Sequence, residues 1–150
     1  MDHIDRAIVD QLRHDCRLSN TELADRVGLT PSPCLRRVRK LEADGVVVGY
    51  HARLDPEAVG RGFEVQVDLE LADQARSTIE AFEAALIGYD EVIEARRMFG
   101  APDYHALVAV ADLPTYERFM TQHLTALPGL AKMQSRFAMK TIKSDVPQEH

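Results

Sequence analysis

Residues 30–45, TPSPCLRRVRKLEADG, constrain the fold most because both ends of this stretch carry helix signals. Thr30 suits the N-cap, the proline after it suits the first helical position, and Gly45 suits the left-handed position just beyond a helix. Since Pro33 has no N–H group, the Thr30 hydroxyl can cap only through the amide of Ser32. The sequence therefore predicts one helix with both ends marked.

This helix has two chemically different faces. Its apolar residues recur at helical spacing and should face a protein core: Cys34, Leu35, Val38 and Leu41. The other face gathers four basic residues with no acid among them until Glu42: Arg36, Arg37, Arg39 and Lys40. For an isolated helix, a solvated surface is the ordinary interpretation of such a cluster. The helices predicted beside it favour a polyanionic partner instead.

The net charge of −6 argues against nucleic acid only until its distribution is considered. Residues 1–53 carry 9 Lys and Arg against 8 Asp and Glu, whereas residues 54–150 carry 9 against 16. The acid is therefore concentrated in the second part of the chain. Four of the nine bases of the first part lie in residues 36–40, so one helix of an acidic chain is suited to a polyanion.

Two shorter helices are predicted ahead of the basic one. Residues 2–13 carry an apolar stripe, with acids early and bases late as the helix dipole favours. Ser19 and Glu22 have the spacing of a capping box, and Gly28 ends the helix that follows. The connections are very short, which is typical of a helix-turn-helix whose second helix enters the major groove. We therefore expect residues 1–50 to be a domain that binds double-stranded DNA.

After this domain the hydrophobic period changes. Residues 46–50 are rich in valine and favour a short wing or exit strand. Residues 51–62 contain Asp-Pro and two glycines and are predicted to be a linker or hinge. Residues 63–150 then read as βαββαβ, with strands near 63–71, 92–99, 104–111 and 132–142 and helices near 79–86 and 113–124. This order predicts an α+β chain whose second domain is a ferredoxin-like sandwich.

The first strand of this second domain alternates apolar and polar residues. The sequence predicts only two helices to cover this sheet. We expect these to be too few to bury all of the apolar residues Phe63, Val65 and Val67 and their cross-strand partners. We therefore expect a second subunit against the open face of the sheet, and so a dimer at least.

Other chemistry finds little support. Cys16 and Cys34 have neither metal-ligand nor disulfide-framework spacing, so we interpret both as reduced core residues. We find no zinc motif, phosphate-binding glycine loop or nucleophile elbow, and expect no catalytic residue, metal or cofactor. His105 is interpreted as a core or interface histidine, and a pH-sensing role for it is a secondary hypothesis. With neither a leader nor an apolar run of membrane length, we expect a cytoplasmic protein without a membrane partner.

Taken together, several motifs resemble the Lrp/AsnC (leucine-responsive and asparagine-responsive, feast/famine) family of transcription regulators. In the first domain they include GLTPSPCL at 28–35, RVRKLE at 37–42, GVV at 45–47 and GY at 49–50. In the second they are Gly100-x-x-Asp103-Tyr104 and Leu127-Pro128-Gly129. The resemblance covers nearly the whole chain.

The resemblance implies a winged helix-turn-helix followed by a ferredoxin-like, RAM-type domain that dimerises through its sheet. It implies assembly of dimers into tetramers, octamers or larger discs, with an amino acid or related metabolite bound between dimers. The residues expected at the DNA are Thr30, Ser32, Pro33, Arg36, Arg37, Arg39 and Lys40. Those expected around the effector are Met98, Gly100, Ala101, Asp103 and Tyr104, with Met133 and Ser135 of a neighbouring subunit. Pro102 removes one amide from that loop.

Three functions remain open at this point. The first is a DNA-binding regulator whose assembly or DNA binding responds to an amino acid. The second is a DNA-architectural protein without an effector, and the third is a small-molecule enzyme or binding module whose N-terminal helices serve assembly. The basic cluster favours DNA binding, because an assembly helix buried against a partner would not carry four unpaired bases.

Overall fold

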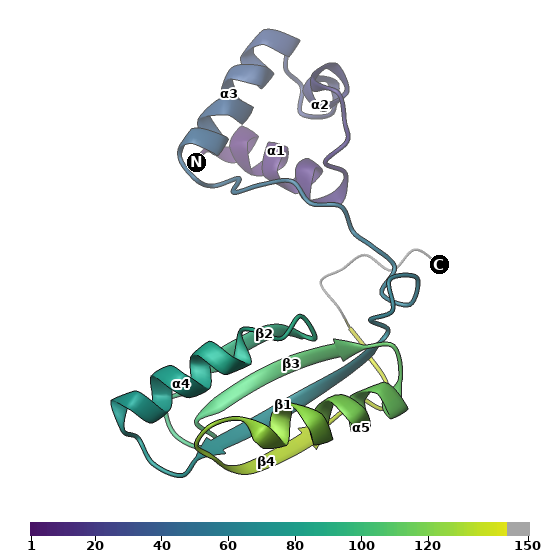
Figure 1. The fold of residues 1–150 in the computed structure, drawn as a ribbon. Coiled ribbons are helices and arrows are strands. Elements are labelled where there is room, and N and C mark those ends of the chain that lie inside the picture. Colours follow the sequence, from purple (N-terminus) through teal and green to yellow (C-terminus); the bar gives the residue numbers. More distant parts are fainter. Residues whose placement is uncertain (144–150) are drawn as a thin grey trace. The chain divides into compact units, whose positions relative to one another are not determined.

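The computed structural model describes residues 1–143, and these form two compact units, Met1–Arg53 and Leu54–Lys143 (Figure 1). The division falls inside the predicted linker, residues 51–62. No helix among the described residues is long and apolar enough to cross a membrane. Each unit has its own hydrophobic core, so each can be considered by itself.

The first unit consists of α1 (His3–His14), α2 (Asn20–Arg26) and α3 (Pro31–Ala43). Both of the first two helices begin with a capping box, formed by Asp2 and Asp5 before α1 and by Ser19 and Glu22 before α2. Their apolar stripes meet in a small core of Ile8, Leu23, Ala24, Val27, Cys34 and Leu41. The three predicted helices are confirmed, and α3 is bounded as its sequence signals indicate.

Four details of the first unit differ from expectation. Thr30 is the N-cap of α3, but its hydroxyl makes no capping hydrogen bond, since two of the next three residues are prolines without an N–H. Cys16 is exposed and only Cys34 is buried, because Cys16 follows the end of α1. Residues 46–50 form no strand, because they pair with no other strand of the described chain. Leu35 is 38% exposed.

The second unit has the element order β1 (Phe63–Leu71), α4 (Arg76–Leu86), β2 (Val92–Arg97), β3 (Tyr104–Val110), α5 (Leu113–Gln122), a 3-10 turn (Leu124–Ala126) and β4 (Leu130–Arg136). The four strands form an antiparallel sheet in the order β2-β3-β1-β4. This is the predicted ferredoxin-like sandwich. The last strand ends at Arg136 rather than near residue 142, so it is shorter than expected.

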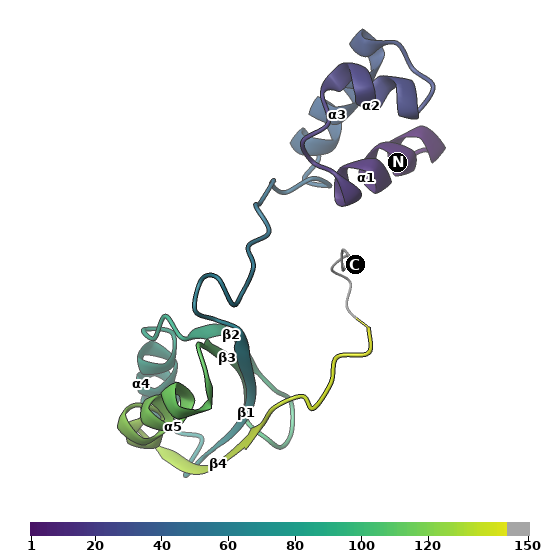
Figure 2. The same cartoon turned by 90° about the vertical axis from the view of Figure 1, so that its right-hand side faces the viewer.

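Both helices of this unit pack on one face of the sheet (Figure 2). Val65 and Val67 are fully buried on that face, so the apolar side of β1 lies under the unit's own helices. The expectation that these residues would need a second subunit was therefore wrong. The two helices suffice because Phe82, Leu86, Tyr116 and Phe119 project from them into the same core.

The opposite, open face of the sheet carries polar side chains. Asp68 lies at its centre, where its Oδ1 contacts His105 Nδ1 at 2.8 Å and its other oxygen pairs with Arg136. Lys132 and Glu70 add another pair across neighbouring strands, with 3.3 Å between Nζ and Oε1. His105 is thus a half-buried histidine on the open face and not part of the helix-covered core.

Candidate nucleic-acid interface and effector site

The turn between α2 and α3 fixes the direction of α3 relative to α2. Gly28 has a φ of 70°, a conformation that side chains with a Cβ rarely adopt, and Leu29 N then donates to Ala24 O at 2.9 Å. Asn20 Nδ2 donates to Pro31 O at 2.8 Å and ties the start of α2 to the start of α3. The chain therefore turns from one helix directly into the next, as a helix-turn-helix requires.

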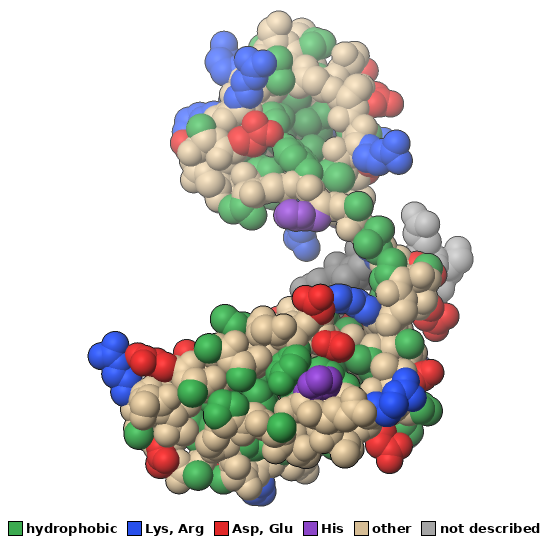
Figure 3. Space-filling model, viewed as in Figure 1, with side chains coloured by type: hydrophobic (Ala, Val, Ile, Leu, Met, Phe, Trp, Pro, Cys, Tyr) green, Lys and Arg blue, Asp and Glu red, His purple; other side chains and the backbone are tan. Residues whose placement is uncertain are grey.

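The outer side of α3 is basic. Lys and Arg side chains gather along this helix in the space-filling view (Figure 3). Arg36 and Arg39 are exposed, and neither has a hydrogen bond or ion pair to any residue in the range 1–143. At the N-terminal end of the helix, Thr30 and Ser32 are exposed and Pro33 is half-buried. These five predicted DNA contacts therefore all lie on α3 or at its start, and none of the five is fully buried.

The other two predicted contacts are paired within the unit. Arg37 Nη1 lies 2.8 Å from Asp2 Oδ2 and 2.7 Å from Asp5 Oδ1, and Lys40 pairs with Asp44 one turn along the helix. The expectation of four unpaired bases was thus wrong for two of them. The partners of Arg37 stand more than thirty positions earlier in the chain, so the order of residues in the helix gave no sign of them.

The two carboxyl groups that bind Arg37 have lowered pKa values. The Asp5 amide and then the Arg37 guanidinium donate to Asp2, and together they lower its pKa to about 2. The Asp2 amide and Arg37 likewise lower the pKa of Asp5. Both carboxylates are therefore charged at neutral pH and remain available to Arg37.

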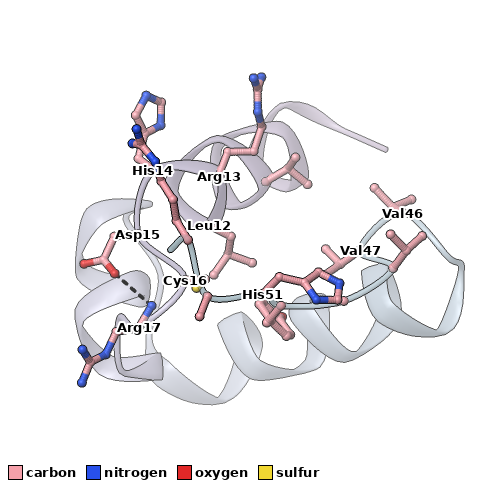
Figure 4. Close-up of a pocket in the computed structure, with 15 residues that line it drawn as sticks. Leu12, Arg13, His14, Asp15, Cys16, Arg17, Val46, Val47 and His51 are labelled. Carbon is pink, nitrogen blue, oxygen red and sulfur yellow. Dashed lines mark hydrogen bonds between the residues drawn. The ribbon is translucent and has the colours of Figure 1, made fainter. Parts of the chain in front are cut away.

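A hollow lies between the last turn of α1, the residues that follow it and residues 46–53 (Figure 4). Its volume is about 650 Å³, and its lining combines Leu12 and Val47 with the polar groups of His51 and Cys16. Val47 N donates to Leu41 O at 3.1 Å, and Tyr50 OH donates to Glu42 Oε1 at 2.8 Å. The segment after α3 is therefore fastened to the end of the helix, although it forms no strand.

Four of the predicted effector residues lie in the hairpin turn between β2 and β3, and the fifth, Tyr104, is the first residue of β3. Met98 and Ala101 are exposed, and Gly100 lies between them with a φ of 109°. Tyr104 is buried, because its ring packs 4.7 Å from that of Phe82 under the sheet. Its hydroxyl donates to Glu83 Oε1 at 2.7 Å, and burial followed by this bond raises the pKa of Tyr104 to about 12.

Asp103 joins the hairpin to the loop after β1. Its Oδ2 accepts from Leu71 N at 2.7 Å, and its Oδ1 accepts from Gln74 Nε2 at 2.9 Å. The backbone carbonyl of the same residue accepts from Met98 N at 2.8 Å. Sequence reasoning missed Gln74, which no motif marks. In this chain Asp103 therefore holds two loops together.

The last two predicted effector residues lie on β4. Ser135 Oγ and Tyr116 OH are 2.6 Å apart, and Met133 packs against the core beneath the sheet. Met133 pairs in register with Leu69, which in turn pairs with Tyr104. The described residues of one chain do not gather all seven effector residues into one cavity. Nor do they contain a group of three or more His, Cys, Asp or Glu residues that could hold a metal ion.

Comparison with known proteins finds a matching domain family for each of the two units. Residues 1–48 match the model of a winged helix-turn-helix DNA-binding domain, and residues 64–148 match that of the Lrp/AsnC ligand binding domain. The Bkd operon transcriptional regulator of Pseudomonas aeruginosa is 39% identical over 142 residues, which are 95% of this chain and 93% of that relative. The leucine-responsive regulatory protein of Salmonella typhimurium is 37% identical over 143 residues, 95% and 87% of the two chains.

Solved structures agree with these relatives. A transcriptional regulator from Neisseria meningitidis, solved in complex with L-Met, superposes with a TM-score of 0.89 at 34% identity, covering 98% of this chain and 96% of the other. An AsnC family transcriptional regulator from Agrobacterium tumefaciens gives 0.87 at 34% identity over 99% and 97%. With both domains matched along nearly their whole length, the chain belongs to the Lrp/AsnC family of transcriptional regulators.

Proposed function

We propose that the protein binds double-stranded DNA through α3 and regulates transcription in response to an amino acid. The observation that carries the DNA part is the pair of exposed guanidinium groups of Arg36 and Arg39 on the second helix of a helix-turn-helix, which no residue of the described chain pairs with. Charges that are not already satisfied within the protein can neutralise phosphates and release their counterions. Ser32 and Pro33 would lie nearest the base edges, at the N-terminal end of the helix.

A dimer would place two copies of α3 in successive major grooves. Its preferred sites should be pseudo-palindromes with half-sites about 10 bp apart or a multiple of that spacing. Affinity should fall with salt by a slope of about −0.9 for each phosphate neutralised. Two phosphates neutralised by each subunit would then give a slope of about −3.6 for the dimer.

A gel-shift titration over a range of salt concentrations tests this interface. Arg36→Ala should weaken binding to all sequences and make the slope less negative by about 0.9 for each phosphate that is no longer neutralised. Arg76→Ala is the control, since it removes an exposed arginine from the second unit, where it pairs with Glu80. If Arg36→Ala binds as the wild type does, the interface is not on this helix face.

The ligand would be an amino acid held between dimers, close to the hairpin that Asp103 fastens. Support comes from the match to the ligand binding domain and from the Neisseria meningitidis relative with its bound L-Met. Calorimetry with the twenty amino acids, each at millimolar concentration, tests this part. Binding of none of them would favour the architectural alternative, in which DNA is bound without an effector.

The open face of the sheet is where a second subunit would pack, and dimers would assemble further into tetramers or octamers. Leu107 is half-buried on this face, which also carries the paired charges of Asp68, His105 and Arg136. Light scattering at micromolar concentration tests the assembly. A stable monomer would refute it.

A further inference from the structure

Arg37 differs from its basic neighbours in where its side chain is held. A single nitrogen, Nη1, bridges Asp2 and Asp5 with distances of 2.8 and 2.7 Å. The Arg37 side chain is 33% exposed and that of Asp5 is 18% exposed, so the contact is partly shielded from water. Charge-assisted bonds of this length are among the stronger polar contacts in a small domain.

The two carboxylates use all of their oxygens in this arrangement. Asp2 Oδ1 accepts the Asp5 amide at 2.9 Å and Asp5 Oδ2 accepts the Asp2 amide at 3.1 Å, which completes the capping box of α1. The remaining oxygen of each acid accepts from Arg37. The guanidinium is therefore bound to the first turn of α1 at the same point that begins that helix.

The charges at this point do not favour a phosphate. Two carboxylates and one guanidinium leave a net charge of about −1 where Arg37 is bound, so a phosphate approaching Arg37 would meet two anions. Arg36 and Arg39 have no acid bonded to them within residues 1–143. The same helix thus carries two kinds of arginine.

We propose that Arg37 is a positioning residue, which locks the recognition helix α3 to the N-terminus of α1, and that it does not contact DNA. The proposal rests on DNA binding by α3, the function proposed above. It gives Asp2 and Asp5 an unexpected part in DNA binding, because two acids would support affinity for a polyanion by holding α3 in place.

Removing the acids tests the proposal, since the two roles of Arg37 predict opposite signs. Asp2→Asn and Asp5→Asn keep side-chain oxygens for the capping box, as asparagine caps about as well as aspartate, but they remove both negative charges. If Arg37 positions α3, the double variant should bind DNA about three- to tenfold more weakly, the size that one or two half-exposed ion pairs can supply. If Arg37 contacted phosphate, freeing it from the acids should tighten binding.

The salt dependence gives a second readout, which a change in folding alone would not move. Arg37→Ala should weaken binding by a similar factor while leaving the slope of log affinity against log salt as in the wild type, and Arg37→Lys should restore part of the affinity. Arg36→Ala should make that slope less negative. Thermal unfolding followed by circular dichroism identifies a temperature at which every variant is folded, and binding is measured there. If the double variant does not fold, the single variant Asp5→Asn is used in its place.

Tighter binding by the acid-to-asparagine variants would overturn the proposal, as would a shallower salt slope for Arg37→Ala. Failure of the underlying function is distinguishable from this. In that case neither Arg36→Ala nor Arg39→Ala would change the affinity, or the wild type would not bind DNA at all.

Discussion

Replacing Asp103 by alanine should destabilise the second unit by about 1–3 kcal/mol. Its carboxylate is the acceptor for Leu71 N at 2.7 Å, and Leu71 is only 8% exposed. The amide would lose its acceptor where water has little access, and an unsatisfied buried donor costs about 1–3 kcal/mol. Gln74 is exposed, so its amide can turn to water and adds little. For a unit of this size, each kcal/mol lowers Tm by about 4–8 °C.

Urea unfolding followed by circular dichroism measures this loss. Asp103→Asn should cost less, since its side-chain oxygen can still accept from Leu71. Asp73→Ala is the control from the loop after β1, where an exposed carboxylate accepts from Ala75 N at 2.9 Å and also from the Thr78 side chain. An unfolding free energy for Asp103→Ala within about 0.5 kcal/mol of the wild type would refute the assignment of Asp103 as the tie between the two loops.

The same variant bears on the effector. Because Asp103 fixes the loop after β1 against the hairpin, its loss should abolish the response of DNA binding to the amino acid while DNA binding itself persists. Allosteric coupling is reciprocal, so DNA should also lose its effect on ligand affinity, typically about 1–3 kcal/mol. Gel shifts with and without ligand measure the first quantity and calorimetry with and without DNA the second. A variant that responds as the wild type does would place the switch elsewhere.

Three further outcomes are expected. Hydrogen bonds in the capping boxes lower the pKa values of Asp2 and Glu22, that of Asp2 to about 2. The stability that these two carboxylates give the folded first unit is therefore complete above about pH 4.5 and is lost as the pH falls toward 2. Urea midpoints measured at several pH values would show this loss. Burial, then the bond to Glu42, raises the pKa of Tyr50 to about 12, so its contribution is lost as the pH rises from about 10 to 12. Absorbance at 295 nm should show one tyrosine fewer titrating late in Tyr50→Phe, while Tyr104 still titrates late. Gly129→Ala should cost more than the roughly 1–2 kcal/mol of a left-handed residue, because φ is 72° and a Cβ would lie 2.3 Å from Thr78 Cγ2; adding Thr78→Ala should recover part of the lost Tm.

Most of the fold could be predicted from local signals. Capping residues such as Ser19 act within three positions of their partners, and the alternation in β1 recurs every second residue, so both are visible in a short stretch. The order of elements then restricts the topology to few choices. Residues 46–50 do not follow their local signal, because valines with high β propensity find no strand to pair with in the described chain.

What the sequence could not provide were partners that lie far apart in the chain. The alternation of β1 marks its apolar side, but what covers that side depends on the side chains of α4 and α5. These helices bury Val65 and Val67 without the second subunit that the sequence predicts. Gln74 and Asp103 are 29 positions apart, and Arg37 and Asp2 are 35 apart. No spacing rule connects such pairs, because they depend on how whole elements pack.

These distant pairs change how an acidic chain can bind a polyanion. A count of bases on α3 treats all four as equal, yet Arg37 and Lys40 direct their charge to Asp2, Asp5 and Asp44. The charge left for phosphate is concentrated on Arg36 and Arg39, so the salt dependence of binding should reflect two phosphates neutralised by each subunit rather than four. On the proposal above, Arg37 gives rigidity instead of attraction, because it joins α3 to the start of α1. The bases of one helix can therefore have two different roles. Arg37, paired with Asp2 and Asp5, holds α3 in place, and this fixes the direction in which Arg36 and Arg39 point toward DNA.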